Sequence, residues 1–264
     1  MNNSSAYLIT GILLSSLVFV GEGWAWVPGG TGGDVNIGGA ITPSSPKNPW
    51  EVLVGSAVTD LNAPIKMGVS NVVIPINKAI TVLGIRTQTN QPFTGGVGMS
   101  PQIDFKGAYN TTQQPFESST GLLSMNVLDV KDGSVIGHLA VPMFSGAISS
   151  WLAGVDSAQN ELYASQSGQG FFGGIASSAS AVSPNIVTTL NTINPEFSAN
   201  YNTQSAGVLN VPVTETYTAV TTTFSAYYGA GIQVGQIMNL VLNTPAASNA
   251  ITWKASLPIT VSYQ

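Results

Sequence analysis

The chain has 264 residues, of which 44% are hydrophobic and only 7% are charged, and its 12 acids and 7 bases give a net charge of -5. Because no cluster of bases is present to neutralise phosphates, this composition argues against nucleic acid as a partner. The chain has no cysteine and one histidine, which excludes disulfides and leaves little with which to build a zinc site or a serine triad. We therefore expect no enzyme, no cofactor and no metal.

Residues 1–25 have the pattern of a signal peptide. Residues 7–20, YLITGILLSSLVFV, form a mostly apolar run that is shorter than the roughly 20 residues needed by a membrane-spanning helix. Gly23 and Ala25 offer small residues before a cleavage site, which leaves Trp26 as the mature N-terminus. Cleavage after Gly23 and an uncleaved anchor are the alternatives.

Residues 26–42 form an extension of a different character. A glycine-rich stretch, WVPGGTGG, comes first, and Val35, Ile37, Gly39 and Ile41 then alternate along the chain. This alternation is the period of a half-buried strand. A strand on such a flexible glycine-rich linker can pair with something other than the body of its own chain.

The body of the chain predicts an all-β fold. Most apolar segments alternate or are short β-branched runs bounded by glycine, proline or asparagine. They predict strands at residues 69–74, 80–83, 102–105, 122–130, 138–141, 208–213 and 237–242. Asp132 and Gly133 have the sequence of a tight hairpin turn, so the strands on both sides of this pair are expected to associate.

Strand periodicity weakens between residues 145 and 200, where serine, alanine, glycine and glutamine dominate. A helix is predicted with Ser183 as its N-cap, Pro184 at its first position and Pro195 at its end. Its apolar face is expected to hold Ile186, Val187, Leu190 and Ile193. We therefore predict an inserted, partly helical subdomain at about residues 107–205.

Few residues suggest chemistry. His138 is expected to face solvent on a strand, and the G-x-G-x-x-G pattern at residues 168–173 lacks a clear preceding strand, which argues against dinucleotide binding. The scattered acids leave a carboxylate pair for glycoside hydrolysis as an open alternative. Four aromatic residues are candidates for stacking on a sugar, with ordinary core packing as the alternative: Trp151, Tyr163, Phe171 and Phe172.

The C-terminal segment WKASLPITVSYQ places Leu257, Ile259, Val261 and Tyr263 on one face of a terminal strand. A penultimate tyrosine after alternating hydrophobic residues resembles the C-terminal signature of chaperone-usher fimbrial subunits. Further blocks, in the same order, are similar to the kappa-type subunits of multimeric adhesive fimbriae from enterotoxigenic enterobacteria: DVNIGGAIT, NPWEVLVG, TVLGIRT, GGVGMSPQIDF, NELYASQSGQGFFGGI and FSAYYGAGIQVGQ. The absence of cysteine also resembles this branch.

The resemblance implies an incomplete immunoglobulin-like sandwich over residues 43–264, completed by donor-strand exchange. In such a subunit, residues 34–41 would be the donor strand, presenting Val35, Ile37 and Ile41, with Gly39 at a point of close approach. The last strand would form an edge of the acceptor groove and would also pair with the chaperone.

Implied partners are other copies or related subunits, a periplasmic chaperone, an outer-membrane usher and a host glycan receptor. The implied location is a surface fimbrium reached through the periplasm. A minor or adaptor subunit is as compatible with the sequence as a major one. The alternative from another class is a freestanding secreted carbohydrate-binding or hydrolytic β protein.

Overall fold

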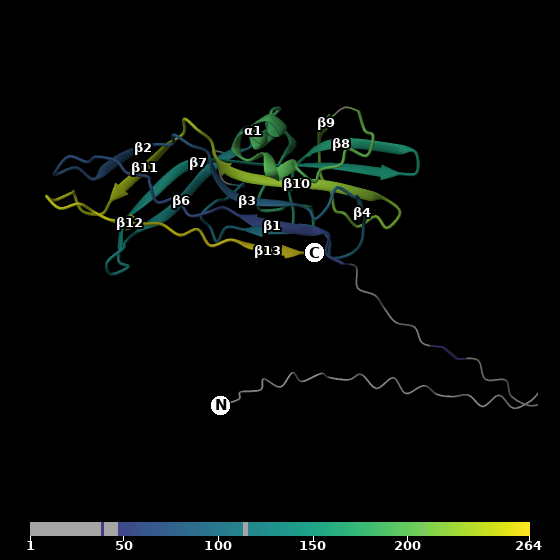
Figure 1. Cartoon of the computed structure of the whole chain (residues 1–264), viewed down its shortest axis with the longest axis horizontal. Helices are drawn as coiled ribbons and strands as arrows, with labels where there is room; N and C mark the ends of the chain where they lie inside the picture. Colours follow the sequence, from purple (N-terminus) through teal and green to yellow (C-terminus); the bar gives the residue numbers. More distant parts are fainter. Residues whose placement is uncertain (1–37, 40–46, 113–115, 208) are drawn as a thin grey trace, which may run out of the picture. The chain divides into compact units, whose positions relative to one another are not determined.

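Figure 1 shows the computed structural model of the chain, which describes residues 38–39, 47–112, 116–207 and 209–264. Residues Ser45–Gln264 form one compact unit, called the body below, and residues Met1–Ser44 form a second unit. Only Gly38 and Gly39 of the second unit are described, and both are exposed. The predicted signal peptide lies outside the described residues.

The body is built around one long strand, β7 (Val135–Ala153). Along one edge of β7 lie β6 (Thr120–Asp129) and then β8 (Asp156–Leu162). Along its other edge lie β11 (Ile237–Leu242) and then β10 (Thr223–Ile232). The sheet therefore has two halves that share β7 (Figure 1).

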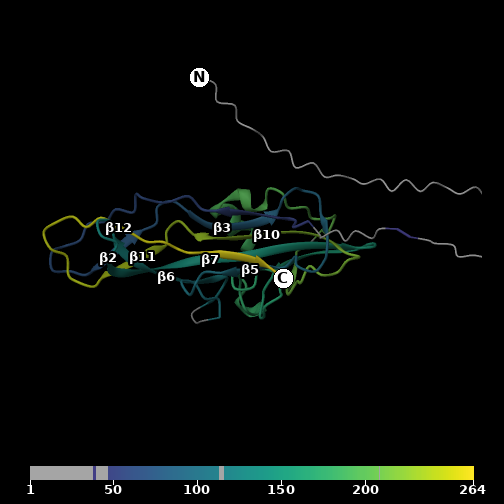
Figure 2. The same cartoon turned by 90° about the horizontal axis from the view of Figure 1, so that it is seen from below.

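Shorter strands extend both halves. Beyond β10 come β3 (Ile80–Thr87) and β1 (Trp50–Val54), and beyond β11 comes β2 (Asn71–Pro75). The remaining strands of this sheet are β4 (Phe93–Thr94) on β10, β9 (Leu209–Val213) parallel to β8, and β12 (Trp253–Lys254) on β6. A separate two-stranded sheet pairs β5 (Pro101–Asp104) with β13 (Thr260–Tyr263). This small sheet lies below β7 in Figure 1 and in front of it in Figure 2.

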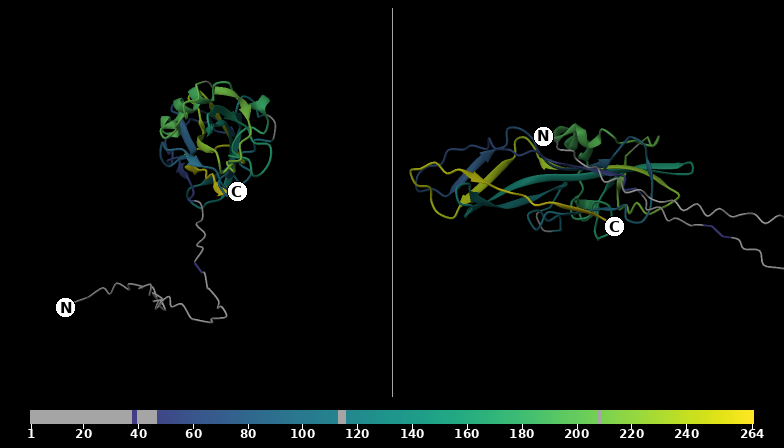
Figure 3. Two further views of the ribbon diagram at one scale, coloured as in Figure 1. Left: turned by 90° about the vertical axis from the view of Figure 1, so that its right-hand side faces the viewer. Right: turned by 60° about the horizontal axis from the view of Figure 1, so that its bottom comes forward.

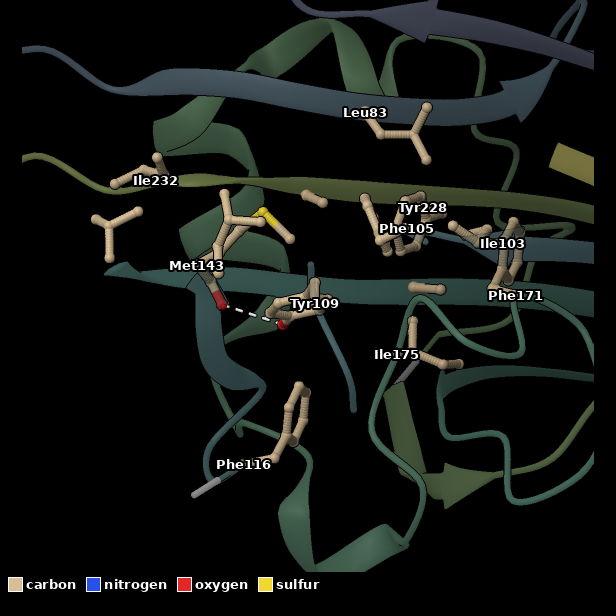
Figure 4. Close-up of a cluster of buried hydrophobic side chains, with 14 of the residues drawn as sticks. Leu83, Ile103, Phe105, Tyr109, Phe116, Met143, Phe171, Ile175, Tyr228 and Ile232 are labelled. Carbon is tan, nitrogen blue, oxygen red and sulfur yellow. Dashed lines mark hydrogen bonds between the residues drawn. The ribbon is translucent and has the colours of Figure 1, made fainter. Parts of the chain in front are cut away.

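The strands surround one main core, as the end-on view in Figure 3 shows. Many of its largest fully buried side chains are aromatic, among them Phe105, Phe171 and Tyr228 (Figure 4). Phe171 stacks on Tyr228 with ring centroids 5.7 Å apart, and Trp50 meets Phe171 edge-on at 5.5 Å. Aromatic pairs of this kind add stabilisation beyond their buried area. Packing thus holds together a body that has no disulfides.

A second, smaller core lies where α1 (Ile186–Ile193) covers the outer face of the sheet. The short 3-10 helix η2 (Pro195–Ser198) follows α1 and places the ring of Phe197 over Gly84 and Gly229. A Cβ atom at Gly229 would lie 2.5 Å from that ring, and one at Gly84 would lie 2.8 Å from it. These two glycines are therefore required for the close approach of helix and sheet. A further 3-10 turn, η1 (Ala179–Ala181), precedes α1.

The structure confirms the all-β fold class, and each predicted strand segment overlaps a strand. The hairpin between β6 and β7 is also confirmed, but its loop is longer than two residues. Leu128 pairs with Val135, and of the two predicted turn residues only Gly133 has a positive φ. The carboxylate of Asp132 accepts the N–H of Ser134, which stabilises the longer loop and lowers the pKa of Asp132.

The helix is confirmed with two corrections. It begins at Ile186, with Asn185 rather than Ser183 as its N-cap, and the Ser183 hydroxyl accepts the N–H of Asn185. Val187 is exposed rather than buried, because it lies about 100° around the helix from Ile186 and outside the buried stripe. The other three predicted residues of the apolar face are buried: Ile186, Leu190 and Ile193.

The weak periodicity after residue 145 does not mark the end of the sheet, since β7 continues to Ala153. Residues 143–150 are all buried, because the main core lies on one face of β7 and α1 on the other. A strand buried on both faces shows no polar alternation. The segment predicted as an insert, about residues 107–205, therefore supplies β6, β7 and β8 to the main sheet as well as α1.

Candidate functional site

The free edge of β1 is the first part of the candidate site. Among the described residues β1 pairs only with β3, where Val52 lies opposite Ile85 and Val54 opposite Leu83. Opposite residues share one face of a sheet, and Ile85 and Leu83 belong to the main core. They are 1% and 0% exposed, yet Val52 and Val54 are 43% and 65% exposed. Of the inward-facing residues of β1, Trp50 is buried in the main core, whereas Val52 and Val54 lack a covering neighbour among the described residues.

The chain after β1 continues this pattern. Leu61, Ala63 and Ile65 are half-buried against the main core, while Asn62 and Pro64 between them are exposed. This is the alternation of a strand. Residues 55–66 are nevertheless outside every strand of the part of the chain that the structure describes, so this segment belongs to no sheet.

The C-terminal segment is the second part of the candidate site. It leaves β6 after Lys254, and it joins β5 only at Thr260. Its predicted apolar residues all pack against the main core, and each is only half-buried: Leu257, Ile259, Val261 and Tyr263. One edge of β13 pairs with β5, and its other edge has no strand among the described residues.

Figure 1 shows β13 below β1 on the same side of the body, and the two strands belong to different sheets. We call the region bordered by β1, residues 55–66 and residues 255–263 the open seam. One border is β1 with residues 55–66, and the other is residues 255–263. The inward-facing side chains of the two borders are apolar, among them Val52, Val54, Leu257, Ile259 and Val261. Such a region suits an apolar strand that also offers backbone hydrogen bonds.

A glycine-rich loop, residues 168–173, holds β5 in place beside β13. The Phe171 N–H donates to Pro101 and the Ile103 N–H donates to Phe172, at 2.6 and 2.8 Å. Gly173 has φ +81, and a Cβ atom there would lie 2.1 Å from the carbonyl oxygen of Ile103. The G-x-G-x-x-G pattern at residues 168–173 therefore serves packing against β5, and no helix begins at it.

The end of the chain is anchored to the same support. Ser100 and Gln264 exchange two backbone hydrogen bonds, at 2.9 and 3.0 Å. The Ser167 hydroxyl donates to the side-chain oxygen of Gln264 at 2.9 Å. One edge of the open seam is thus fixed to the body to its last residue.

A pocket of about 410 Å³ opens where the C-terminal segment separates from β6. It includes Ser256 and Pro258 of that segment and Ser124 and Asn126 of β6. Its charged group, Lys106, lies 2.6 Å from the carboxylate of Asp104, and this hydrogen bond lowers the pKa of Asp104. The pocket has no arrangement of acid, base and nucleophile that would suit catalysis.

A second pocket, of about 250 Å³, lies on the outer face between β1, β3 and η2. Arg86 lies between two carboxylates there, 2.6 Å from Glu51 and 3.3 Å from Glu196. Burial opposes the charge of Arg86, but the hydrogen bonds to both carboxylates outweigh it and raise the pKa of Arg86. These partly exposed pairs join β1 to η2 at little net gain in stability.

The structure separates the predicted site residues. Val35, Ile37 and Ile41 lie outside the described residues, and Gly39 is exposed with no atom within 4 Å of an added Cβ. His138 is exposed on β7, as predicted.

The four candidate aromatic residues do not form one platform. Phe171 is 0% exposed and lies in the main core, so it offers no surface to a ligand. Trp151, Tyr163 and Phe172 are partly buried against the same core. None of the ring contacts found among the described residues joins two of these four.

The sequence predicts the C-terminal border of the open seam but not the border formed by β1. The segment WEVLV has alternating valines after Trp50, which is the signal that was available. Alternation alone does not distinguish a covered valine from an uncovered one, because that difference depends on the neighbouring strand.

The described residues offer neither a metal centre nor a membrane-spanning helix. They contain no group of three or more His, Cys, Asp or Glu residues that could hold a metal ion. None of their helices is long and apolar enough to cross a membrane.

Comparison with known proteins gives one consistent result. The family described as "Fimbrial, major and minor subunit" matches residues 6–264. K88 fimbrial protein AC and K88 fimbrial protein AD, both from Escherichia coli, are each 27% identical to this chain. Each alignment covers 92% of this chain and 94% of the relative.

Proposed function

Because the chain belongs to the family of major and minor fimbrial subunits, we propose that it polymerises by donor-strand exchange. Its role as a structural, non-enzymatic subunit of a cell-surface fimbrium follows from the family. The finer mechanism rests on one observation, which is the exposure of inward-facing side chains along the open seam. Val52 and Val54 have the position of core residues and the exposure of surface residues.

The proposed donor is residues 34–41 of another copy or of a related subunit. Val35, Ile37 and Ile41 alternate, so one face of this strand would fill the seam while its backbone pairs with a free edge. Full burial of an aliphatic side chain contributes about 1.5–3 kcal/mol, so three such residues contribute on the order of 5–9 kcal/mol. Gly39 would occupy the point where the groove leaves no room for a side chain.

We propose that the chaperone and the usher act at the same free strand edge of the open seam. A free strand edge beside apolar side chains promotes aggregation until another strand covers it. A periplasmic chaperone that pairs with the C-terminal segment would provide that cover during export. The usher would then replace the chaperone strand with the donor of the next subunit.

We also propose adhesion to host glycoconjugates, as the resemblance to adhesive fimbriae implies. The fibre would support or mediate it. Trp151, Tyr163 and Phe172 keep some exposed surface and are the proposed contacts to test. Fibres that bind no glycan, with or without these side chains, would leave this subunit a purely structural role.

Donor-strand exchange is tested by changing one face of the donor at a time. Ile37→Asp should abolish polymerisation, because a buried carboxylate without a partner is costly. Asn36→Asp adds the same charge to the opposite face and should leave fibres intact. The measurement is the ladder of subunit oligomers from intact cells. Normal fibres from the Ile37→Asp subunit, or from one lacking residues 34–41, would disprove the mechanism.

Chaperone capture is tested in the same way at the other border. Val261→Asp should remove the subunit from the periplasm, whereas Ser262→Asp, on the exposed side of β13, should not. The readout is the amount of subunit that copurifies with the chaperone. Equal amounts for the two variants would contradict the proposed role of the last strand.

A further inference from the structure

The half-sheet formed by β2, β11, β7 and β6 has an outer face that no described element covers. Its outward-facing residues form three rows; the strand pairing joins two of them across all four strands, and the third consists of one β2–β11 pair and one β7–β6 pair. One row is entirely apolar, with Pro75 opposite Ile237 and Pro142 opposite Leu122. The other two rows contain no Asp, Glu, Lys or Arg; one is Val73, Asn239, Ala140 and Ser124, and the other is Asn71, Val241, His138 and Asn126. We call this surface the bare face.

The bare face mixes apolar with polar residues, and several of its apolar residues are exposed. Val73, Ile237 and Leu122 are 58%, 48% and 49% exposed. Single exposed aliphatic residues are ordinary, whereas several that lie together on one surface are a common feature of interaction sites. The same face of β7 is treated differently farther along the strand, where Ile186 of α1 packs over Gly146. The body covers one half of this face and leaves the other open.

We infer that the bare face binds the bare face of a second copy of this chain in an adjacent fibre. This inference rests on the proposed polymerisation. A partner that brought a charged side chain to this surface would bury it without a counter-charge, at a large cost. A second bare face has no charged positions in its three rows, and two sheets pack well face to face at about 10 Å.

The area of the bare face indicates whether isolated subunits or only assembled fibres form this contact. Four strands about 4.8 Å apart and three outward positions about 6.8 Å apart along each strand span about 400 Å². Two such surfaces bury about 800 Å² in total, which is below the roughly 1,200 Å² of a stable interface. Isolated subunits are therefore too weakly held to dimerise this way. Fibres repeat the contact many times, and multivalency makes it effective, so the expected result is lateral bundling.

The test places opposite charges on the same position in two sets of fibres. Fibres of Ile237→Lys and fibres of Ile237→Glu should each stay dispersed, with a pelleted fraction at low speed at least about fivefold below that of unaltered fibres. A one-to-one mixture should pellet again, because Lys on one fibre then meets Glu on another. Electron microscopy of the same samples reports whether fibres form and whether they lie side by side.

The control is the pair Val187→Lys and Val187→Glu, which alters an exposed position on α1 and should leave bundling unchanged. If the Ile237 variants fail to assemble, the same charges at Val73, which is more exposed, decide the question. Single fibres from the unaltered chain, bundles of either charged set alone, or a mixture that stays dispersed would each overturn the inference. Failure of the unaltered chain to polymerise would instead contradict the proposed function.

Discussion

Two tyrosines of the main core differ in whether their hydroxyl groups have partners. The Tyr109 hydroxyl bonds the carbonyl of Met143 at 3.1 Å and the hydroxyl of Ser145 at 2.9 Å. The Tyr228 hydroxyl is buried without a hydrogen-bond partner among the described residues. Burial raises the pKa of both groups, so both stay neutral. The value of each hydroxyl to stability then depends on its hydrogen bonds.

We predict that Tyr109→Phe lowers the free energy of unfolding by about 1–2 kcal/mol. The substitution removes the hydroxyl and with it the hydrogen bonds to the Met143 carbonyl and the Ser145 hydroxyl, which are both buried. Tyr228→Phe is the matched control and should be neutral or stabilising, since it removes a polar group that gains no hydrogen bond. Thermal unfolding of the two variants in the same assembly state measures the difference. A larger loss for Tyr228→Phe would contradict this assignment.

The carboxylate of Glu161 gives the body a specific pH dependence. Glu161 is only 8% exposed on β8, and burial raises its pKa. Below the ordinary pKa of a glutamate, both the folded and the unfolded chain hold the proton and no penalty exists. As the pH rises, the unfolded chain ionises first, so stability falls until the folded pKa is passed.

Replacing this carboxyl by an amide removes the penalty. Glu161→Gln should therefore raise the free energy of unfolding at pH 7 and change it little at pH 3. Glu117→Gln, at an exposed position, should have a small effect at both. Unfolding curves at the two pH values provide the measurement, and an equal gain for Glu161→Gln at both pH values would refute the explanation.

The packing of α1 and η2 on the sheet requires strand glycines beneath their large apolar side chains. The ring of Phe197 and the side chain of Leu190 both occupy the space where a Cβ of Gly229 would lie. Ile186, Leu190 and Ile193 are buried against the small core under the helix. The element is thus held by close approach.

Gly229→Val should destabilise the body by about 1–3 kcal/mol, because the helix must move to accommodate the added atoms. Gly207→Val is the matched control, since a Cβ atom there meets nothing within 4 Å. Denaturant unfolding compares the two variants. Similar midpoints for both would show that α1 does not rest on this glycine.

The elements show what the sequence reveals and what it conceals. Strands with one solvent-exposed face, such as β6 and β11, can be predicted from the alternation of apolar and polar residues. The second half of β7 and all of β10 cannot, because both of their faces are buried and the alternation is lost. The prediction that Val187 lies on the buried face of α1 is wrong. The sequence does not show whether an apolar residue at the margin of a helix face is buried or exposed.

The candidate site was predictable in part for a similar reason. The alternation from Leu257 to Tyr263 is visible in the sequence and matches the half-buried face of the C-terminal segment. The opposite border was not predicted, because Val52 and Val54 look like core residues in the sequence. Only the spatial arrangement shows that the neighbour which should cover them is absent from the described body.

At the scale of the whole molecule, the structure combines a well-packed core with one incomplete border. Trp50 contacts Phe93, Phe171 and Tyr217 within 5.5 Å, two residues from Val52. The core is therefore closely packed beside the place where the body lacks a strand. Core side chains that are packed before a strand binds need little reordering when it binds, which favours affinity.

We propose that a strand fills the open seam when subunits assemble, and two single thiols can report whether it does. The chain has no cysteine, so Val54→Cys and Val211→Cys each introduce a single thiol. In the body alone these positions are 65% and 75% exposed, and both lie on edge strands. Their thiols would react with a maleimide at similar rates if the seam stayed empty.

The measurement is the rate of maleimide labelling of the two variants in assembled fibres. We predict that the thiol of Val54→Cys reacts at least about a hundredfold more slowly than that of Val211→Cys, because a donor strand buries it. Comparable rates for the two thiols in the same fibres would contradict the account.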